Sequence, residues 1–111
     1  MKVPHKYRKA LLIDIDGTVL EHKGDCKTQK PLKDAVEWVN KKLEEGYGIF
    51  FFTSRLPEEK EATEATLDKF GFKYHSVIYG KPYADFTTII DDRDFDVIKV
   101  HRNKGVSQLL K

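Results

Sequence analysis

Short, continuous apolar runs alternate with amphipathic stretches along most of the chain. The runs are rich in β-branched and aromatic residues and end in polar or turn-forming residues, which is typical of buried strands. We therefore expect one strand that begins near Ala10 and runs to Asp14, and others over residues 47–53, 74–79 and 87–90. Residues 96–101 alternate in part and predict a fifth, edge strand.

The amphipathic stretches predict helices. After residue 31, apolar residues recur at helical spacing and form one stripe, made of Leu32, Ala35, Val36, Val39 and Leu43. Pro31 suits the first turn of this helix and Gly46 suits its end. A second helix is expected over residues 58–70 and a short terminal helix over residues 105–111. The second helix should face the sheet with small residues, namely Ala62, Ala65 and Thr66.

This alternation of strands and helices predicts the α/β class. The natural architecture is a three-layer α/β/α sandwich, in which helices cover both faces of a mainly parallel, Rossmann-like sheet. The chain has 111 residues, enough for a single domain over residues 1–111 with a sizeable core.

Composition narrows the function classes. The 20 Lys and Arg and the 18 Asp and Glu give a net charge of +2, and the two signs are interspersed, so no nucleic-acid surface is predicted. Cys26 is the single cysteine, which favours a reducing compartment. Residues 1–8 lack the apolar core of a signal peptide, and no apolar run approaches the ~18 residues of a membrane span. We expect a cytoplasmic protein without a membrane partner.

Reactive side chains stand at the ends of the expected strands. They are Asp14 and Asp16, Thr53 with Ser54, Lys81, and Asp91 with Asp92. Because the carboxyl ends of parallel strands share one edge of the sheet, these residues should converge on one crevice. Carboxylates are the hard oxygen ligands that select Mg²⁺, and an ammonium with a hydroxyl suits phosphoryl oxygens. The pattern predicts a magnesium-dependent phosphoryl-transfer site.

Four of these stretches resemble the motifs of the haloacid dehalogenase (HAD) superfamily. Asp14-Ile15-Asp16-Gly17-Thr18, after an apolar strand, is similar to its first signature, and Thr53 to its second motif. Lys81 in Gly80-Lys81-Pro82 resembles the third motif, and Ile89-Ile90-Asp91-Asp92 the fourth. The motifs follow the family's order over most of the chain. The resemblance implies an HAD-like fold and a phosphomonoester hydrolase.

The resemblance also implies a role for each residue. Asp14 would attack phosphorus to form an aspartyl-phosphate, and Asp16 would protonate the leaving oxygen and then deprotonate the hydrolytic water. Mg²⁺ would be held by Asp14, the backbone carbonyl of Asp16, and Asp91, with Asp92 acting indirectly or through a water. Thr53 would bind a phosphoryl oxygen, and Lys81 would neutralise Asp14 and the phosphate together.

Some of these residues also have a structural reading. Asp91-Asp92 could be a solvated turn before Arg93, and Lys81 could be an ordinary surface lysine. Arg55, beside Ser54, could bind substrate or could pair with Glu58 or Glu59.

Many HAD relatives carry a cap domain, but the gaps between these motifs are too short for one. The site should therefore be open, covered only by a flap over residues 17–30, with Gly24-Asp25 as a turn, or by a second copy of the chain. A weaker likeness to small phosphatases of polysaccharide and nucleotide-sugar biosynthesis favours a phosphorylated sugar or related metabolite as substrate. The alternatives are a phosphatase of nucleotides or nucleic-acid ends, and a non-catalytic module of the same fold that binds metal and phosphate.

Overall fold

The computed structural model of the chain describes residues 6–23 and 28–110. Its elements, in chain order, are β1 (Ala10–Ile13), α1 (Ala35–Glu44), β2 (Gly48–Phe52), the 3₁₀ turn η2 (Pro57–Glu59), α2 (Lys60–Lys69), β3 (Ser76–Ile78) and the 3₁₀ helix η3 (Gly105–Leu109). Cys26 and the expected Gly24-Asp25 turn lie outside the described residues. Within the described ranges, no helix combines the length and apolar character needed to cross a bilayer.

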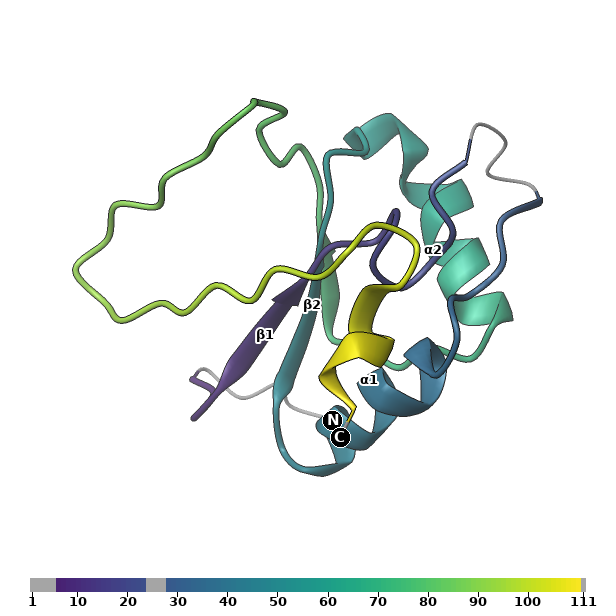
Figure 1. Cartoon of the computed structure of the whole chain (residues 1–111), viewed down its shortest axis with the longest axis horizontal. Coiled ribbons are helices and arrows are strands. Elements are labelled where there is room, and N and C mark those ends of the chain that lie inside the picture. The colour runs from purple at the N-terminus through teal and green to yellow at the C-terminus, as the bar shows by residue number, and fades with distance from the viewer. Residues whose placement is uncertain (1–5, 24–27, 111) are drawn as a thin grey trace.

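The described strands form one parallel sheet in the order β1-β2-β3 (Figure 1). In the observed register, Ile13 of β1 lies opposite Phe51 of β2, and Phe52 lies opposite Ile78 of β3. Neighbouring parallel strands need a crossover connection, and α1 and α2 supply the two that are required. The predicted α/β class and mainly parallel sheet are therefore confirmed, and no separate cap domain is present among the described residues.

The helices α1, α2 and η3 lie on one face of this sheet (Figure 1). Alternate residues of the strands point toward them, and Ile13, Ile49 and Phe51 are buried there. The same core contains Ile15, Val19, Leu20, Ala35, Val39, Leu67, Phe72 and Val106. Full burial of one such large side chain stabilises the fold by about 1.5–3 kcal/mol, so this face holds the sheet and its helices together.

The opposite face of the sheet carries aromatic side chains. The ring of Phe50 packs against the rings of Tyr7 and His75, with centroid distances of 5.5 and 5.8 Å. Leu12 remains 48% exposed on β1. The second helical layer of the expected sandwich is not among the described elements.

The start of α1 differs from the prediction. The apolar stripe begins at Leu32, whereas the helix begins at Ala35. Pro31 forms a β-bridge with Leu20, and the Leu32 N–H donates to the Val19 carbonyl at 2.9 Å. The placement of Pro31 in the first helical turn was wrong, because these contacts hold the backbone extended just before the helix.

The buried side of α2 also differs from the prediction. Thr63 and Leu67 are fully buried, whereas Ala62 and Ala65 are exposed. Leu67 is the large apolar residue of this helix, so its burial sets the rotation of the helix about its axis. Thr63 lies one turn earlier on the same side and is thereby directed toward the end of β2.

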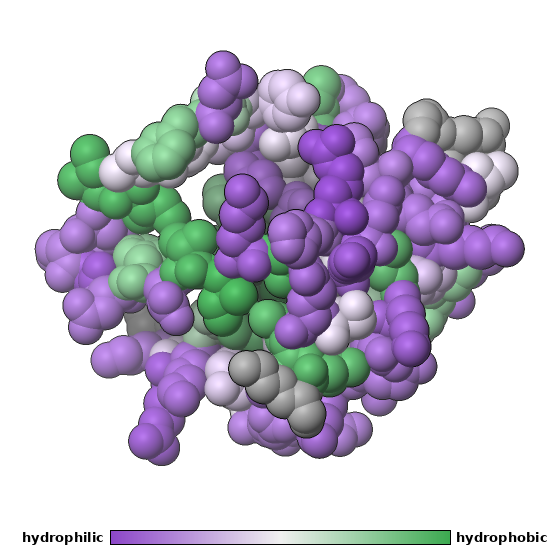
Figure 2. Space-filling view, viewed as in Figure 1, coloured by the Kyte–Doolittle hydropathy of each residue, from purple (hydrophilic) through white to green (hydrophobic). Residues whose placement is uncertain are grey.

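A long segment, residues 79–104, runs away from the sheet at the left of Figure 1. Residues 82–99 are exposed throughout, with Phe86 at 85% and Ile90 at 94%, and Figure 2 shows hydrophobic residues gathered on this side. The strands predicted over residues 87–90 and 96–101 are not formed. A strand needs a neighbouring backbone to pair with, and within the described ranges none bonds to residues 82–99.

The short terminal helix predicted over residues 105–111 is present as η3, which packs against the turn after β1. The Val106 N–H donates to the Thr18 carbonyl at 3.2 Å, and the Asn103 N–H donates to the Gly17 carbonyl at 2.9 Å. Gly105 has a left-handed backbone (φ 59°), and a Cβ there would collide with the Thr18 carbonyl oxygen. This close approach therefore requires glycine.

Gly105→Ala should lower the free energy of unfolding by about 2–4 kcal/mol, because the left-handed backbone and the collision both become costly. Urea unfolding measures the loss. Gly46→Ala is the matched control, since Gly46 is also left-handed (φ 99°) but has open space around it. It should cost only about 1–2 kcal/mol. Equal losses in the two variants would contradict the close packing of η3.

Candidate active site

The chain turns sharply directly after β1. Ile15 is fully buried, and its carbonyl oxygen accepts hydrogen bonds from the N–H groups of Thr18, Val19 and Leu20. Side chains alternate along an extended backbone, so the burial of Ile15 leaves Asp14 and Asp16 on the open side. Their side chains are 38% and 26% exposed. The apolar core thus presents two carboxylates at the carboxyl edge of the sheet.

Asp14 is held between an ammonium and a hydroxyl. Lys81 Nζ donates to Asp14 Oδ1 at 2.8 Å, and Thr18 Oγ1 donates to Asp14 Oδ2 at 3.1 Å. The Lys81 backbone N–H donates to the Thr53 carbonyl at 2.9 Å, and the Lys81 ammonium lies 5.5 Å from the Phe52 ring centroid. The structure therefore brings Asp14, Thr53 and Lys81 together, although they follow three different strands.

Asp16 is engaged by Arg55, a partner that the sequence did not indicate. Arg55 donates from Nε to Asp16 Oδ2 at 3.0 Å and from NH2 to Oδ1 at 2.7 Å, so the ion pair is bidentate. Gln29 Nε2 donates to the same Oδ1 at 2.7 Å. Arg55 also donates to Gln29 Oε1 at 2.8 Å and to Thr63 Oγ1 at 3.0 Å. This network links Gln29 to the segments that follow β1 and β2 and to α2.

These partners shift the acidity of Asp16. Partial burial is the largest single influence and raises the pKa of the carboxyl. The hydrogen bonds from Arg55 and Gln29, together with the Arg55 charge, outweigh that influence, so the pKa of Asp16 lies below its ordinary value. Asp16 is therefore held as a carboxylate in this arrangement.

Thr53 forms the turn at the end of β2. It is 1% exposed, its N–H donates to the Ile78 carbonyl at 3.0 Å, and its Oγ1 accepts a hydrogen bond from the Arg55 N–H at 3.1 Å. Ser54 lies half-buried in the same turn. The threonine hydroxyl thus supports the backbone that aims Arg55 at Asp16.

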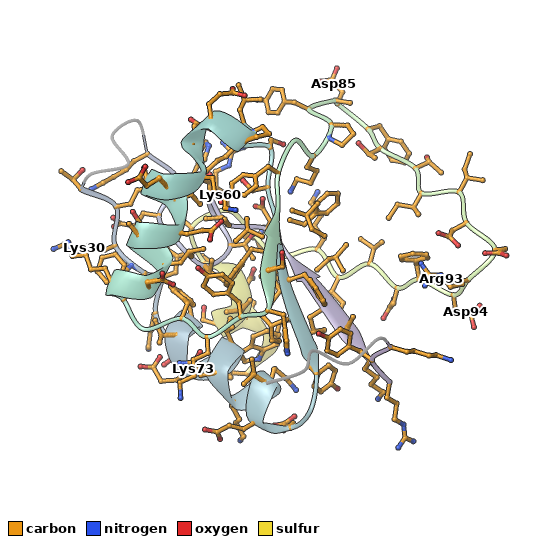
Figure 3. All side chains as sticks on the ribbon, turned by 180° about the vertical axis from the view of Figure 1, so that it is seen from behind. Lys30, Lys60, Lys73, Asp85, Arg93 and Asp94 are labelled. Carbon is orange, nitrogen blue, oxygen red and sulfur yellow. The ribbon has the colours of Figure 1, made fainter. Side chains whose placement is uncertain are left out.

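Asp91 and Asp92 lie apart from this group, on the exposed segment of residues 79–104. Asp91 accepts a hydrogen bond from the Arg93 N–H at 2.9 Å, which is the main reason that the pKa of Asp91 lies below its ordinary value. Figure 3 shows Arg93 and Asp94 at the far end of this segment. The structure thus places the pair in a solvated turn, and it does not bring them to Asp14 and Asp16.

Magnesium is the metal that the sequence motifs imply. Asp14 and Asp16 offer the hard oxygen atoms that Mg²⁺ prefers, but each carboxylate is paired with a cationic side chain here. Within the described residues, no group of three or more His, Cys, Asp or Glu is placed to hold a metal ion. The arrangement therefore does not fit the metal as it stands.

Gln29 and Thr63 are functional candidates that sequence reasoning missed. Gln29 is 4% exposed and Thr63 is fully buried, and both bond to Arg55. Neither belongs to a recognisable motif. The nearest available signal was the position of Thr63 one turn before Leu67, which marks it as an inward-facing residue of α2.

Arg55→Met should destabilise the chain by about 1–3 kcal/mol near pH 6, because it leaves Asp16 without its charged partner. The folded pKa of Asp16 lies below the unfolded value of 3.8. Its ionic contribution is therefore fully present above the unfolded pKa and is lost as the pH falls through the folded pKa. The stability difference between the two chains should shrink toward pH 3. Urea unfolding without divalent cations tests this, and a constant difference would contradict it.

The chain is similar to one family of known phosphatases. The family described as HAD superfamily, subfamily IIIB (acid phosphatase) matches residues 23–89 of the chain. The match includes Thr53, Arg55 and Lys81, and lies between the turn that carries Asp14 and the pair that begins at Asp91. Among curated proteins, no sequence matches significantly.

A solved structure supports the fold. The crystal structure of an MCSG target from Vibrio cholerae is similar, with a TM-score of 0.59. The two chains are 23% identical, and the match covers 78% of this chain and 82% of that one. This likeness bears on the fold alone, while the family match extends over more than half of the chain. The chain belongs to the acid phosphatase family of the HAD superfamily, subfamily IIIB.

Proposed function

We propose that this phosphatase hydrolyses phosphate monoesters through an aspartyl-phosphate on Asp14. The observation that carries the proposal is the position of Asp14 at the open end of β1, with Lys81 Nζ 2.8 Å from its carboxylate. A carboxylate that approaches a phosphate meets another anion. The ammonium beside it reduces this repulsion and stabilises the charge that develops on the phosphoryl oxygens.

The proposed reaction has two displacements. First, Asp16 takes up a proton as the anionic substrate binds beside it, because a nearby negative charge favours the neutral carboxyl. An Asp14 oxygen then bonds to phosphorus, the bond from phosphorus to the ester oxygen breaks, and Asp16 gives its proton to that oxygen. Second, water attacks the phosphorus, Asp16 takes a proton from the water, and the bond to Asp14 breaks. Inorganic phosphate leaves, and both carboxyl groups return to their starting states. Two smaller barriers replace one large barrier.

The groups after β2 and β3 are proposed to bind the phosphoryl oxygens. The backbone bond between Lys81 and Thr53 joins the ammonium and the hydroxyl in one unit, with Ser54 next in the chain. Arg55 already pairs with Asp16 and Thr63. We therefore propose that Arg55 contributes to substrate binding less than Lys81 and serves mainly to hold Asp16.

We also propose that the reaction depends on Mg²⁺, which would supply further neutralisation of the phosphate. A site would need Asp91 beside Asp14. β1 is an edge strand of the described sheet, and its four residues are followed by Asp14 just as residues 87–90 are followed by Asp91. If residues 87–90 paired in parallel with the open edge of β1, the two aspartates would become neighbours, with Asp92 next in the chain.

The proposed substrate is a phosphorylated sugar or related small metabolite. The proposal rests on a likeness to small phosphatases of polysaccharide and nucleotide-sugar biosynthesis. The stretches that carry it are Thr53-Ser54-Arg55, Lys81-Pro82-Tyr83-Ala84-Asp85 and Ile90-Asp91-Asp92. The exposed carboxylate of Asp14 leaves the reacting group accessible from solvent. We propose that the flap or a second copy of the chain provides the cover that a cap gives in larger relatives.

Asp14→Asn should reduce phosphate release from para-nitrophenyl phosphate at least ~10³-fold, because the amide cannot act as the nucleophile. Circular dichroism and urea unfolding should show a retained fold. Asp96→Asn, on the exposed segment, is a matched control that should keep its activity. Activity in the Asp14 variant would contradict the assignment. Failure of the unaltered chain on a broad panel of phosphate esters would favour the non-catalytic module.

Removal of divalent cations with EDTA should abolish hydrolysis, and added Mg²⁺ should restore it. Asp91→Asn should raise the Mg²⁺ concentration needed for half-maximal activity about tenfold or more, because a charged ligand is lost. Asp94→Asn lies on the same exposed segment and should leave that concentration unchanged. Activity that withstands EDTA, or equal effects of the two substitutions, would count against the proposed metal site.

A further inference from the structure

We propose that Gln29 is a positioning residue that selects which oxygen of Asp16 exchanges the proton during hydrolysis. The inference rests on the proposed function, in which Asp16 carries that proton, and it adds a residue of the flap to the site. The observation behind it is that the two carboxylate oxygens of Asp16 accept different numbers of hydrogen bonds.

Gln29 is a buried amide with polar partners on both of its atoms. Its Nε2 donates to Asp16 Oδ1 at 2.7 Å and to the Glu21 carbonyl at 2.5 Å, while its Oε1 accepts a hydrogen bond from Arg55 at 2.8 Å. The side chain is 4% exposed, so these bonds replace those that water would make. One planar group thus joins the flap to the ends of β1 and β2.

The chemistry of the partners requires glutamine at this position. A carboxylate only accepts hydrogen bonds and a guanidinium only donates them, so the bridging group needs one donor and one acceptor. The orientation of the amide follows from the same rule. Glutamate would lack the donor for Asp16, and methionine would fill the space without either bond.

The network occupies the oxygens of Asp16 unequally. From the residues that the structure describes, Oδ1 accepts two hydrogen bonds, from Gln29 and from Arg55 NH2, whereas Oδ2 accepts one, from Arg55 Nε. Each carboxylate oxygen offers about two acceptor positions, so Oδ1 is filled and Oδ2 keeps one free. Oδ2 is therefore the oxygen that gives the proton to the leaving group and later takes one from water, and Gln29 holds it in one orientation.

A series of substituted phenyl phosphates tests this, because its members share a shape and differ in the acidity of the leaving phenol. Assays with saturating Mg²⁺ would compare Gln29→Met with the unaltered chain. Misplacement of the proton carrier should lower kcat/KM for phenyl phosphate about tenfold or more. For para-nitrophenyl phosphate, whose leaving group needs little protonation, the loss should be several times smaller. A purely structural role would lower both rates by the same factor.

Lys30→Ala is the matched control, since Lys30 is the exposed neighbour of Gln29 in the flap. It should leave the dependence on the leaving group unchanged. Gln29→Glu is the second variant, in case methionine prevents folding, and should show the same selective loss. If the Gln29 variants lost the same factor in kcat/KM for every substrate of the series, the proposed role of Gln29 would be overturned, but the proposed function would not. Absence of hydrolysis by the unaltered chain would overturn the proposed function and this inference with it.

Discussion

The site depends on the register between β1 and β2. Ile13 lies opposite Phe51, and both point into the core beneath the helices. Because strand side chains alternate with a period of two, a slip of one residue would move buried side chains to the open face. In the observed register, Asp14 leaves β1 at the same edge where Thr53 leaves β2. The packing of the apolar core therefore aligns the polar groups of the site, although no core residue takes part in the proposed reaction.

The second constraint is that the negative charges at the carboxyl edge of the sheet must be neutralised. Asp14 and Asp16 are neutralised in different ways. Lys81 makes one contact with Asp14, and both side chains are accessible, at 28% and 38% exposure. Arg55 grips Asp16 with two nitrogens and is 12% exposed. The Lys81 ammonium, on a flexible side chain, can turn from Asp14 toward a phosphate. The planar Arg55 guanidinium uses two of its nitrogens on Asp16 and would have to break both bonds to bind a phosphate. This contrast matches the proposed division of labour, in which Asp14 attacks and Asp16 is held.

Local signals predicted the elements whose burial is continuous or strongly periodic. The apolar run of residues 47–53 forms β2, and residues 58–70 form η2 and α2. Prediction failed where the structure of a segment depends on the segment that packs or pairs with it. Residues 87–90 have the composition of a strand, but a strand exists only when a neighbour supplies its hydrogen bonds. The rotation of α2 likewise follows the burial of Leu67, whereas Ala62 and Ala65, which were expected to face the sheet, are exposed.

The sequence by itself determined the kinds of reactive group and where they leave the strands. Two aspartates separated by one apolar residue must face the same side of an extended backbone, because that alternation is local. Only the tertiary structure decided which partner each charge takes. Arg55 pairs directly with Asp16, Gln29 bonds to both, and Asp91 accepts a hydrogen bond from Arg93. Each of these contacts depends on which segments the folded chain brings within reach of a flexible side chain. Spacing along the chain carries no record of those contacts.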